Sequence, residues 1–493
     1  MTLFFLLPKV AWLAKENIDI MESFEIIVFC RFPSHIACAL DSLLRFAHQP
    51  LHPLLLRFLM MFIDFEQWPL VFRLSSVCCA VACAVVVFYF SLNVFKDRRT
   101  AFAAFILLNM HGLFLFYSRR AEVYILFLFL VMLSQYFFWQ TFILGNKKHV
   151  WQYCSISIIA FFTHYITLCI VLAQFLTMGL ISLKNNRGVM KFRYLNFLKA
   201  MIICNFVVIP VLPILGVSIL NNTFWSDMPW SNTFYLSSSY LPKIIKGNMT
   251  LLFSSPINKG WFILGGYVAY FIYLLRKLRS DNYEFFALTI SSFFVAGLYQ
   301  LAFFMTMYKT IGRFYFNFRH LIWLVPLVSM VFAYGLSLIK KSGAKSIGII
   351  IICIMTVLIV GNGFYMNKQI LFDSKTPDYR GALNNIEDNW LPGDGLTVPV
   401  DWPTGLMEMY VSQIFKEKNV KVNVLTASNL SETRRLYNRI WVVIPKEDYF
   451  GIAHMDPGTL DKYINLLNNN FEMLSFWESN KIKVYLSQGD LKN

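Results

Sequence analysis

"LFYSRRAEVYILFLFL", residues 115–130, places three charged side chains, Arg119, Arg120 and Glu122, between two long apolar runs. An apolar helix of about 20 residues crosses the roughly 30 Å hydrocarbon core of a bilayer. Charges are costly at that depth, so the three charged residues are expected where one span ends and the next begins. The stretch therefore predicts two membrane spans joined by a short charged turn at one membrane face.

Apolar runs of span length recur along the 493 residues, which are 57% hydrophobic and only 15% charged. They lie at residues 70–95, 100–117, 123–144, 150–163, 165–183, 196–218, 258–275, 284–306, 321–339 and 346–365. Residues 2–14 are a shorter apolar segment that could be a signal-peptide core, a short first span or a poorly inserted segment. Because no small-residue cleavage site follows, a first span is favoured. The pattern predicts a polytopic α-helical membrane protein with about eleven transmembrane helices.

The net charge of +16 is concentrated in alternate loops. Residues 96–99, 147–148, 184–193, 276–279 and 340–345 hold fifteen Lys or Arg and one acid, Asp97. This alternation is typical of the cytoplasmic side of a membrane protein and does not require a nucleic-acid partner. The intervening loops, and all residues after 365, are therefore predicted to face outward.

The chain divides into a predicted transmembrane domain, residues 1–365, and a C-terminal extracytoplasmic α/β domain, residues 366–493. External loops are expected at 15–66, where "PLHPLLLRFLMMF" is amphipathic and predicted to lie along the interface, and at 219–257. In the tail, "PDYRGALNNIEDNWLPGDG" predicts a helix closed by a turn. "GLTVPV", "VKVNVLT", "RIWVVIP" and "KIKVYLS" predict short strands.

A second group of basic residues departs from the charge rule. "MYKTIGRFYFNFRH", residues 307–320, places Lys309, Arg313 and Arg319 in a predicted external loop without an acid. Arginine binds phosphate through two parallel hydrogen bonds, so the cluster suits an anionic lipid head group. An ordinary interfacial belt of basic residues is the alternative, as it is for Arg119 and Arg120.

Candidate carboxylates lie in the first external loop. Asp19 and Glu22 would share one face of a helix, and either could act as a general base for an acceptor hydroxyl. No Asp or Glu falls at the centre of a predicted span, although ion-coupled transporters commonly keep an ionisable group there. The nine cysteines follow no metal-binding spacing, and no metal or cofactor is predicted.

Several motifs in order along the chain resemble those of the C-type glycosyltransferases, in particular family 39, with the protein O-mannosyltransferases and aminoarabinose transferases. The motifs are "LHPLLLRFL" with His52, "FRLSSVCCAVACAVVVFYF", "YSRRAEVY", "THYITLCIVLAQ" with His164, "NFRHLIWLVPLVSMVFAYGL" and the "PDYRGALNNIEDNWLPGDGLTV" of the tail. The order of these motifs covers most of the chain.

The resemblance implies a polyprenyl-phosphate-linked sugar donor, an inverting transfer on the outer membrane face and no obligatory metal. It also implies a catalytic Asp in an Asp-Glu pair, where this chain has Met21 and Glu22. Glu22 is therefore the first candidate for the base and Asp19 the alternative. Arg120 and Glu122 stand at positions where the family has Glu and Arg, and His320 replaces a Tyr.

The predicted substrate-binding set combines the charge pattern with the resemblance. It comprises His52, Arg119, Arg120, Glu122, Tyr124, His164, Lys309, Arg313, Arg319 and His320. For His52, Tyr124 and His164 a purely structural role at the interface is an equal alternative. The acceptor is a glycan, lipid or protein, and membrane lipids surround the bundle.

The predicted function is a membrane glycosyltransferase, and the tail motif favours a bacterial inner membrane. Two other functions fit parts of the pattern. A flippase or other transporter for lipid-linked sugars would explain the bundle and the outer cations, and the altered Asp-Glu pair is compatible with a catalytically inactive glycan-binding relative.

Overall fold

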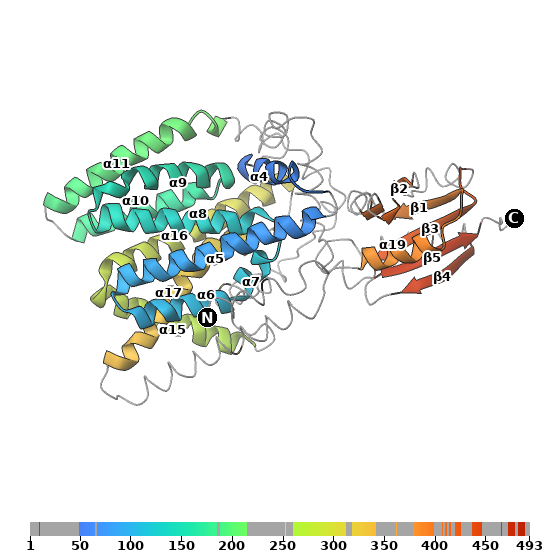
Figure 1. The fold of residues 1–493 in the computed structure, drawn as a ribbon. Helices are drawn as coiled ribbons and strands as arrows, with labels where there is room; N and C mark the ends of the chain where they lie inside the picture. Colours follow the sequence, from blue (N-terminus) through green and yellow to red (C-terminus); the bar gives the residue numbers. More distant parts are fainter. Residues whose placement is uncertain are drawn as a thin grey trace.

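The computed structural model of this chain contains a large helical bundle and a C-terminal sheet domain (Figure 1). It describes residues 9, 49–64, 67–184, 188–213, 252, 260–311, 318–341, 361, 378–398, 407, 410–411, 414–415, 420–424, 436–445, 465, 472–478 and 482–488.

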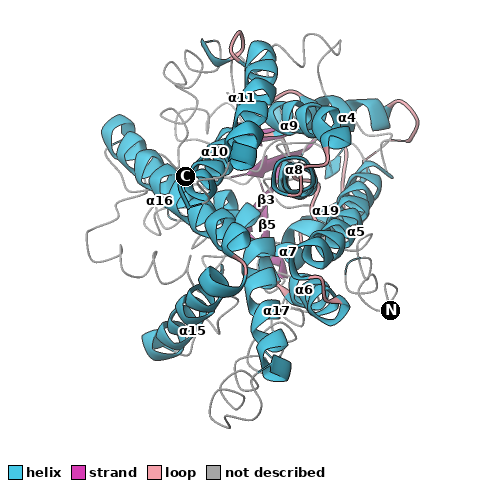
Figure 2. Cartoon of the chain, turned by 90° about the vertical axis from the view of Figure 1, so that its left-hand side faces the viewer, coloured by secondary structure: helices cyan, strands magenta, loops and turns pink. Residues whose placement is uncertain are grey.

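The bundle is built from eleven described α-helices (Figures 1 and 2). They are α4 (Leu51–Met60), α5 (Trp68–Phe95), α6 (Arg98–Met110), α7 (Gly112–Ser118), α8 (Val123–Phe138), α9 (Val150–Thr163), α10 (Thr167–Lys184), α11 (Gly188–Val208), α15 (Gly260–Asp281), α16 (Tyr283–Ile311) and α17 (Val325–Lys341). A π-helical turn, Trp139–Ile143, continues α8, and 3-10 helices precede α9 at Lys147–His149 and α17 at Phe318–Leu324.

Five described helices are long and apolar enough to cross a membrane. They are Trp68–Phe95, Val123–Ile143, Thr167–Lys184, Tyr283–Phe303 and Arg319–Leu338, and α6 with α7 forms a sixth span if that bent pair is counted as one. These six agree with predicted spans and identify a multi-pass membrane protein.

The remaining predicted spans have different outcomes. Helices α9, α11 and α15 occur where three were expected, although α9 has only 14 residues. A helix of that length covers about 21 Å, which is short for a bilayer core. The predicted spans at 2–14 and 346–365 lie outside the described residues, apart from Lys9 and Gly361.

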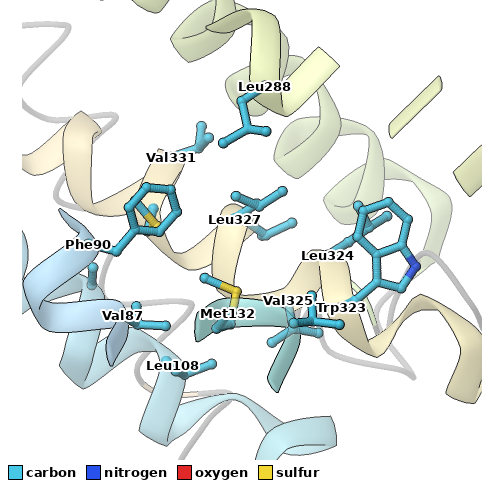
Figure 3. Close-up of a cluster of buried hydrophobic side chains, with 14 of the residues drawn as sticks. Val87, Phe90, Leu108, Met132, Leu288, Trp323, Leu324, Val325, Leu327 and Val331 are labelled. Carbon is cyan, nitrogen blue, oxygen red and sulfur yellow. The ribbon is translucent and has the colours of Figure 1, made fainter. Parts of the chain in front are cut away.

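The last described span is the most enclosed of the five. In Arg319–Leu338, 89% of the most apolar window is buried inside the protein. Leu324, Leu327 and Val331 project from it among apolar side chains of neighbouring helices, such as Phe90 and Leu288 (Figure 3). Because lipid tails are as apolar as these side chains, such packing stabilises the bundle through close van der Waals contact.

Glycine allows α17 to approach α15 closely. A Cβ at Gly335 would collide with the hydroxyl of Tyr270 and with the side chain of Leu274. Small residues at helix crossings serve this purpose in membrane bundles.

One end of the bundle is held by contacts between the turns that carry basic residues. Asn282 Nδ2 donates to the carbonyl of Val94 at 2.9 Å, and the Tyr334 hydroxyl donates to Asp281 at 2.7 Å. Arg193 donates to the carbonyl of Ile143. The turns after α5, α8 and α15 therefore gather at one end, away from the sheet domain (Figure 1).

The opposite end faces the sheet domain. Leu56 of α4, Phe72 of α5 and Ala121 belong to one buried apolar cluster with residues of that domain, among them Tyr379 and Trp441. The charged turn at 119–122 thus lies at the end of the bundle that the C-terminal domain covers.

The C-terminal domain contains a five-stranded sheet in the order β2-β1-β3-β5-β4. Its strands are β1 (Asp394–Val398), β2 (Val422–Val424), β3 (Arg439–Pro445), β4 (Glu472–Glu478) and β5 (Ile482–Gln488), and α19 (Tyr379–Asp388) precedes them. Strands β1, β2 and β3 pair in parallel, whereas β5 pairs antiparallel with β3 and β4. The domain boundary predicted at residue 366 lies outside the described residues.

Four of the five strands and the helix lie where the sequence predicts them. Strand β4 was missed because Glu472, Ser475 and Glu478 interrupt its apolar pattern and an irregularity at Ser475/Trp477 breaks the alternation. It pairs only with β5 among the described strands and therefore needs fewer inward-facing residues.

A hydrogen-bonded ion pair organises the start of this sheet. Arg439 of β3 donates to both carboxylate oxygens of Asp394 in β1, at 2.8 and 2.6 Å. The Trp441 indole and the backbone N–H of Leu391 each donate to the same carboxylate at 2.9 Å. Burial alone would raise the pKa of Asp394, but these hydrogen bonds and the charge of Arg439 lower it below its ordinary value.

We expect Asp394→Asn to destabilise the sheet domain by about 2 kcal/mol, because Arg439 would lose the charge that compensates its own. Hydrogen exchange of β1 and β3 peptides in the purified full-length protein measures the loss. Asp388→Asn, at an exposed position at the end of α19, is the matched control. Equal protection in both variants would contradict a stabilising role for the pair.

The same carboxylate predicts a pH dependence. A group whose pKa is lower in the folded state contributes stability that is present above its unfolded-state pKa, about 3.9 for Asp, and is lost as the pH falls through the folded-state value. We therefore expect denaturant titrations to show a weaker sheet domain at pH 3 than at pH 7 in the wild type. The difference should shrink in Asp394→Asn.

Candidate active site at the domain-facing end of the bundle

The span formed by α6 and α7, which leads to the charged turn, is broken. Helices α6 and α7 meet at an angle of 65°, and His111 between them has an extended backbone, with φ −73° and ψ 123°. Its Nε2 is 3.0 Å from the carbonyl oxygen of Leu252, a residue 141 positions away. A break within a span leaves backbone groups that must find partners inside the protein. The break redirects α7 and determines where the charged turn lies.

The charged turn is more enclosed than the sequence suggested. Arg119 ends α7 and is 2% exposed, while Glu122 precedes α8 and is 4% exposed. Arg120 Nη1 is 3.5 Å from Glu122 Oε1, and the Arg120 guanidinium lies 4.0 Å from the centre of the Phe116 ring. A local ion pair is therefore present, but Arg119 and Glu122 do not reach out to the surface as interfacial residues do.

Charged groups from distant parts of the sequence meet around Tyr117. Arg319, Glu122, Tyr124 and Arg120 all lie close enough to the Tyr117 hydroxyl to interact with it electrostatically. The rings of Tyr117 and Tyr124 are 5.0 Å apart. The structure thus brings Arg319, which precedes α17, to the turn between α7 and α8.

The imidazole rings of His164 and His320 lie side by side next to the charged turn and form an imidazole wall. His164, at the end of α9, packs against Tyr124 at 5.9 Å and against His320 at 5.8 Å between ring centres. His164 Nδ1 accepts a hydrogen bond from the backbone N–H of Ile166 at 3.2 Å. That bond leaves the proton of a neutral ring on Nε2.

His320 is bonded to one tyrosine, which lies next to a second. A hydrogen bond of 2.8 Å joins its Nδ1 to the hydroxyl of Tyr299 in α16. The Tyr299 hydroxyl is in turn 3.5 Å from that of Tyr165. The predicted residues Tyr124, His164, Arg319 and His320 are therefore contiguous with the charged turn.

His52 approaches from the amphipathic helix α4. It is 4% exposed and lies one helical turn before Leu56, on the face that packs towards Ala121 and the sheet domain. Phe58, Met61 and Phe62 at the other side of this segment are 51%, 65% and 69% exposed. An exposed apolar face fits the predicted position along a membrane interface.

Some predicted residues lie outside the described part of the chain. These are Asp19, Glu22 and Arg313. The backbone of Lys309 is part of α16, but the side chain of this residue is not described. The predicted base therefore remains a prediction from sequence.

Sequence reasoning did not single out Tyr117, Tyr165 or Tyr299. The first two stand inside the quoted motifs "YSRRAEVY" and "THYITLCIVLAQ", so their motifs were a usable signal. Tyr299 lies in an apolar helix without any local signal. Among the described residues, no group of three or more His, Cys, Asp or Glu could hold a metal ion.

No protein-family model matches the sequence, and no curated protein matches it. Solved structures do. Apo ArnT from Cupriavidus metallidurans is similar with a TM-score of 0.53, and the same protein bound to undecaprenyl phosphate with a TM-score of 0.51. Each comparison has 10% identity and covers 98% of this chain and 96% of that chain.

An oligosaccharyltransferase from Archaeoglobus fulgidus, in complex with Zn and sulfate, has a TM-score of 0.48 at 12% identity, over 89% of this chain and 64% of that chain. The nearly complete mutual coverage with ArnT extends over both the bundle and the C-terminal domain. The predicted resemblance to C-type membrane glycosyltransferases is therefore confirmed at the level of the fold.

We expect Tyr299→Phe to lower the free energy of unfolding by about 1 kcal/mol, because His320 would lose a hydrogen-bond partner in a buried position. Thermal unfolding of the detergent-solubilised protein measures the change. Tyr136→Phe is the control, since its ring packs against Phe137 and no hydrogen bond of its hydroxyl is found among the described residues. Identical melting of the two variants would argue against the contact at His320.

Proposed function

We propose that this protein transfers a sugar from a polyprenyl-phosphate-linked donor to an acceptor on the outer face of the membrane, with inversion at the anomeric carbon. The observation that carries the proposal is the meeting of Arg319 with Arg120 and Glu122 around Tyr117, at the end of the bundle next to the sheet domain. The fold of ArnT supports the reaction class, and its complex with undecaprenyl phosphate motivates the choice of donor.

The cations are suited to the leaving group. When the bond between the anomeric carbon and the phosphate oxygen breaks, negative charge grows on the lipid phosphate. Arg319, with Arg313 and with Lys309 or Arg120, would stabilise that charge through fixed donors, which is the largest single contribution in many enzymes. Because guanidinium groups supply this stabilisation, the proposed mechanism requires no metal.

The acceptor is activated from the opposite side. Glu22, or Asp19 in its place, would take the proton from an acceptor hydroxyl or amine as the new bond to the anomeric carbon forms. The incoming group attacks the face opposite the phosphate, so one displacement inverts the configuration. Holding donor and acceptor together on the bundle supplies the rest of the acceleration.

The imidazole wall would shape the sugar pocket. His164 and His320 offer ring nitrogens, and Tyr124 and Tyr165 offer flat faces beside them. Such a lining combines apolar contact with a few fixed polar groups, as small-molecule sites usually do. The acceptor class, a glycan, lipid or protein, would be selected by the outer loops and the sheet domain.

A transporter of lipid-linked sugars is the competing function, and one finding bears on it. Two sequence arguments count against a transporter: the C-terminal domain, and the absence of Asp or Glu at the centre of any predicted span. The buried side chain of Lys9, beside Phe114 of α7, shows that an ionisable group does lie within the bundle. Reconstitution in vesicles separates the two functions, because a transporter moves labelled lipid-linked sugar without forming a new glycosidic bond. Glycan binding without turnover would instead favour an inactive relative.

We expect Arg319→Ala to reduce transfer by a factor of about 10² to 10³, as removal of one oxyanion donor does in other enzymes. Transfer of labelled sugar from a panel of polyprenyl-phosphate sugars is measured in proteoliposomes. The panel is chosen from mass spectra of lipids, glycans and envelope proteins in cells with and without the gene. Arg276→Ala, an exposed arginine at the other end of the bundle, should retain full activity.

Full activity of Arg319→Ala at unchanged protein level would contradict the proposed phosphate site. Glu22→Gln and Asp19→Asn test the base in the same assay. If one of them is the base, that variant should lose transfer while still binding donor. Normal turnover in both would exclude these carboxylates.

A further inference from the structure

The backbone of the charged turn, residues 119–122, belongs to neither of the helices beside it. Two hydrogen bonds join its first half to α7, from the N–H of Arg119 to the carbonyl of Phe116 at 3.4 Å and from the N–H of Arg120 to the carbonyl of Tyr117 at 3.3 Å. Both are longer than the usual length of about 2.9–3.0 Å for a backbone hydrogen bond. Packing of side chains is therefore expected to contribute to the shape of the turn.

Ala121 is the apolar residue of this turn. It is 1% exposed and stands between Arg120 and Glu122, whose side chains lie 3.5 Å apart. Because consecutive Cα atoms are about 3.8 Å apart, the position of Ala121 restricts where the two charged side chains begin. A displacement of about 1 Å within an active site can lower the rate of an enzyme about a hundredfold. The packing of Ala121 therefore bears on the arrangement of both charges.

Ala121 is packed into an apolar cluster that extends into the sheet domain. From the bundle, the cluster includes Leu56 of α4 and Phe72 of α5, both 0% exposed. Phe72 stacks on Trp68, with 6.3 Å between the ring centres, and Trp68 also packs against the cluster. From the sheet domain, the cluster includes Tyr379, Ala382, Leu383 and Ile386 of α19 and Leu396, Val398, Trp441 and Val443 of the sheet. A protein interior packed as densely as a crystal transmits displacements.

The cluster lies on one face of the sheet. In β3, Trp441 and Val443 belong to it, whereas Val442 between them is 1% exposed but is not a member. This alternation is expected, because successive side chains of a strand point to opposite faces. Among the described residues, the face that carries Val443 is the one that this cluster connects to the charged turn.

We propose that the sheet domain positions the charged turn through this cluster, and that Ala121 is a positioning residue of the candidate active site. The core of the domain restrains Leu56 and Phe72, and these side chains restrain Ala121. Ala121 in turn sets the spacing of Arg120 and Glu122. The inference deepens the proposed function and rests on it for the effect on sugar transfer, whereas the restraint on the turn does not depend on any reaction.

Val443→Ala and Val442→Ala form a matched pair for the test. Both remove the same atoms from buried positions of the same strand, and only the first of the two positions lies in the cluster. Hydrogen exchange is measured by mass spectrometry on the purified full-length protein in detergent. Peptides that cover the charged turn report on the turn, and peptides of β3 report on the domain.

We expect Val443→Ala to speed exchange in the charged turn by a factor of about ten, the order that removal of buried methyl groups produces. Val442→Ala should leave the turn at the wild-type rate. Exchange of the β3 peptides should rise in both variants, because each loses packing in the same strand. A domain that contributed stability alone would give the two variants the same exchange rate in the turn.

Leu56→Ala and Leu56→Met test the link from the side of the bundle. Truncation of Leu56 should speed exchange in the turn, whereas methionine, which has nearly the same volume, should keep the wild-type rate. Wild-type exchange of the turn in both Leu56→Ala and Val443→Ala would overturn the inference. So would exchange that is as fast in Val442→Ala as in Val443→Ala.

Sugar transfer gives a separate measurement. Val443→Ala should lower kcat about tenfold and leave KM for the donor unchanged, because displaced charges stabilise the leaving phosphate less while the lipid still binds. Val442→Ala should keep both values. Unchanged kcat despite faster exchange of the turn would overturn the assignment of Ala121 as a positioning residue. Faster exchange in a protein that transfers no sugar would contradict the glycosyltransferase proposal and leave the restraint on the turn standing.

Discussion

The hydrocarbon core of the membrane offers no hydrogen bonds, and this constraint shapes the rest of the molecule. Backbone groups are satisfied within long apolar helices, and charged side chains are displaced to the ends. At the break in the α6–α7 span, the backbone N–H of His111 still donates to Leu108 and its carbonyl still accepts from Leu115, while its side chain bonds to the carbonyl of Leu252. Because that break turns α7 through 65°, the charged turn at 119–122 is directed inward, towards Tyr117 and Arg319.

Burial of the charged turn changes what its charges can do. A guanidinium exposed at an interface is screened by water and contributes little to binding one particular anion. Arg119 and Glu122 are almost fully enclosed, and Arg120 is restrained by both Glu122 and Phe116. Fixed charges in a poorly solvated site stabilise a developing anion more strongly, since they do not have to reorganise. The arrangement suits chemistry at a phosphate ester better than a simple interfacial anchor.

The sheet domain is connected to this region by packing. Leu56, Phe72 and Ala121 share an apolar cluster with the core of the domain, and His52 lies on the same helix as Leu56. Within the domain, the carboxylate of Asp394 links β1 to β3 through Arg439 and Trp441. Contact between the bundle end and an ordered domain would restrict how an acceptor reaches the outer side of the site.

Much of the architecture follows from local sequence. Runs such as 70–95 and 123–144 predict spans because crossing a bilayer requires length and apolarity alone, and alternating β-branched residues predict β1, β2, β3 and β5. Two of the quoted motifs also contain His164 and His320, whose rings the structure brings together. Tertiary structure decided the rest: the bend at His111, the approach of Arg319 to Tyr117, the hydrogen bond between Tyr299 and His320 and the burial of Lys9. Each of these depends on contacts between residues far apart in the chain, and no local pattern specifies which distant groups will meet.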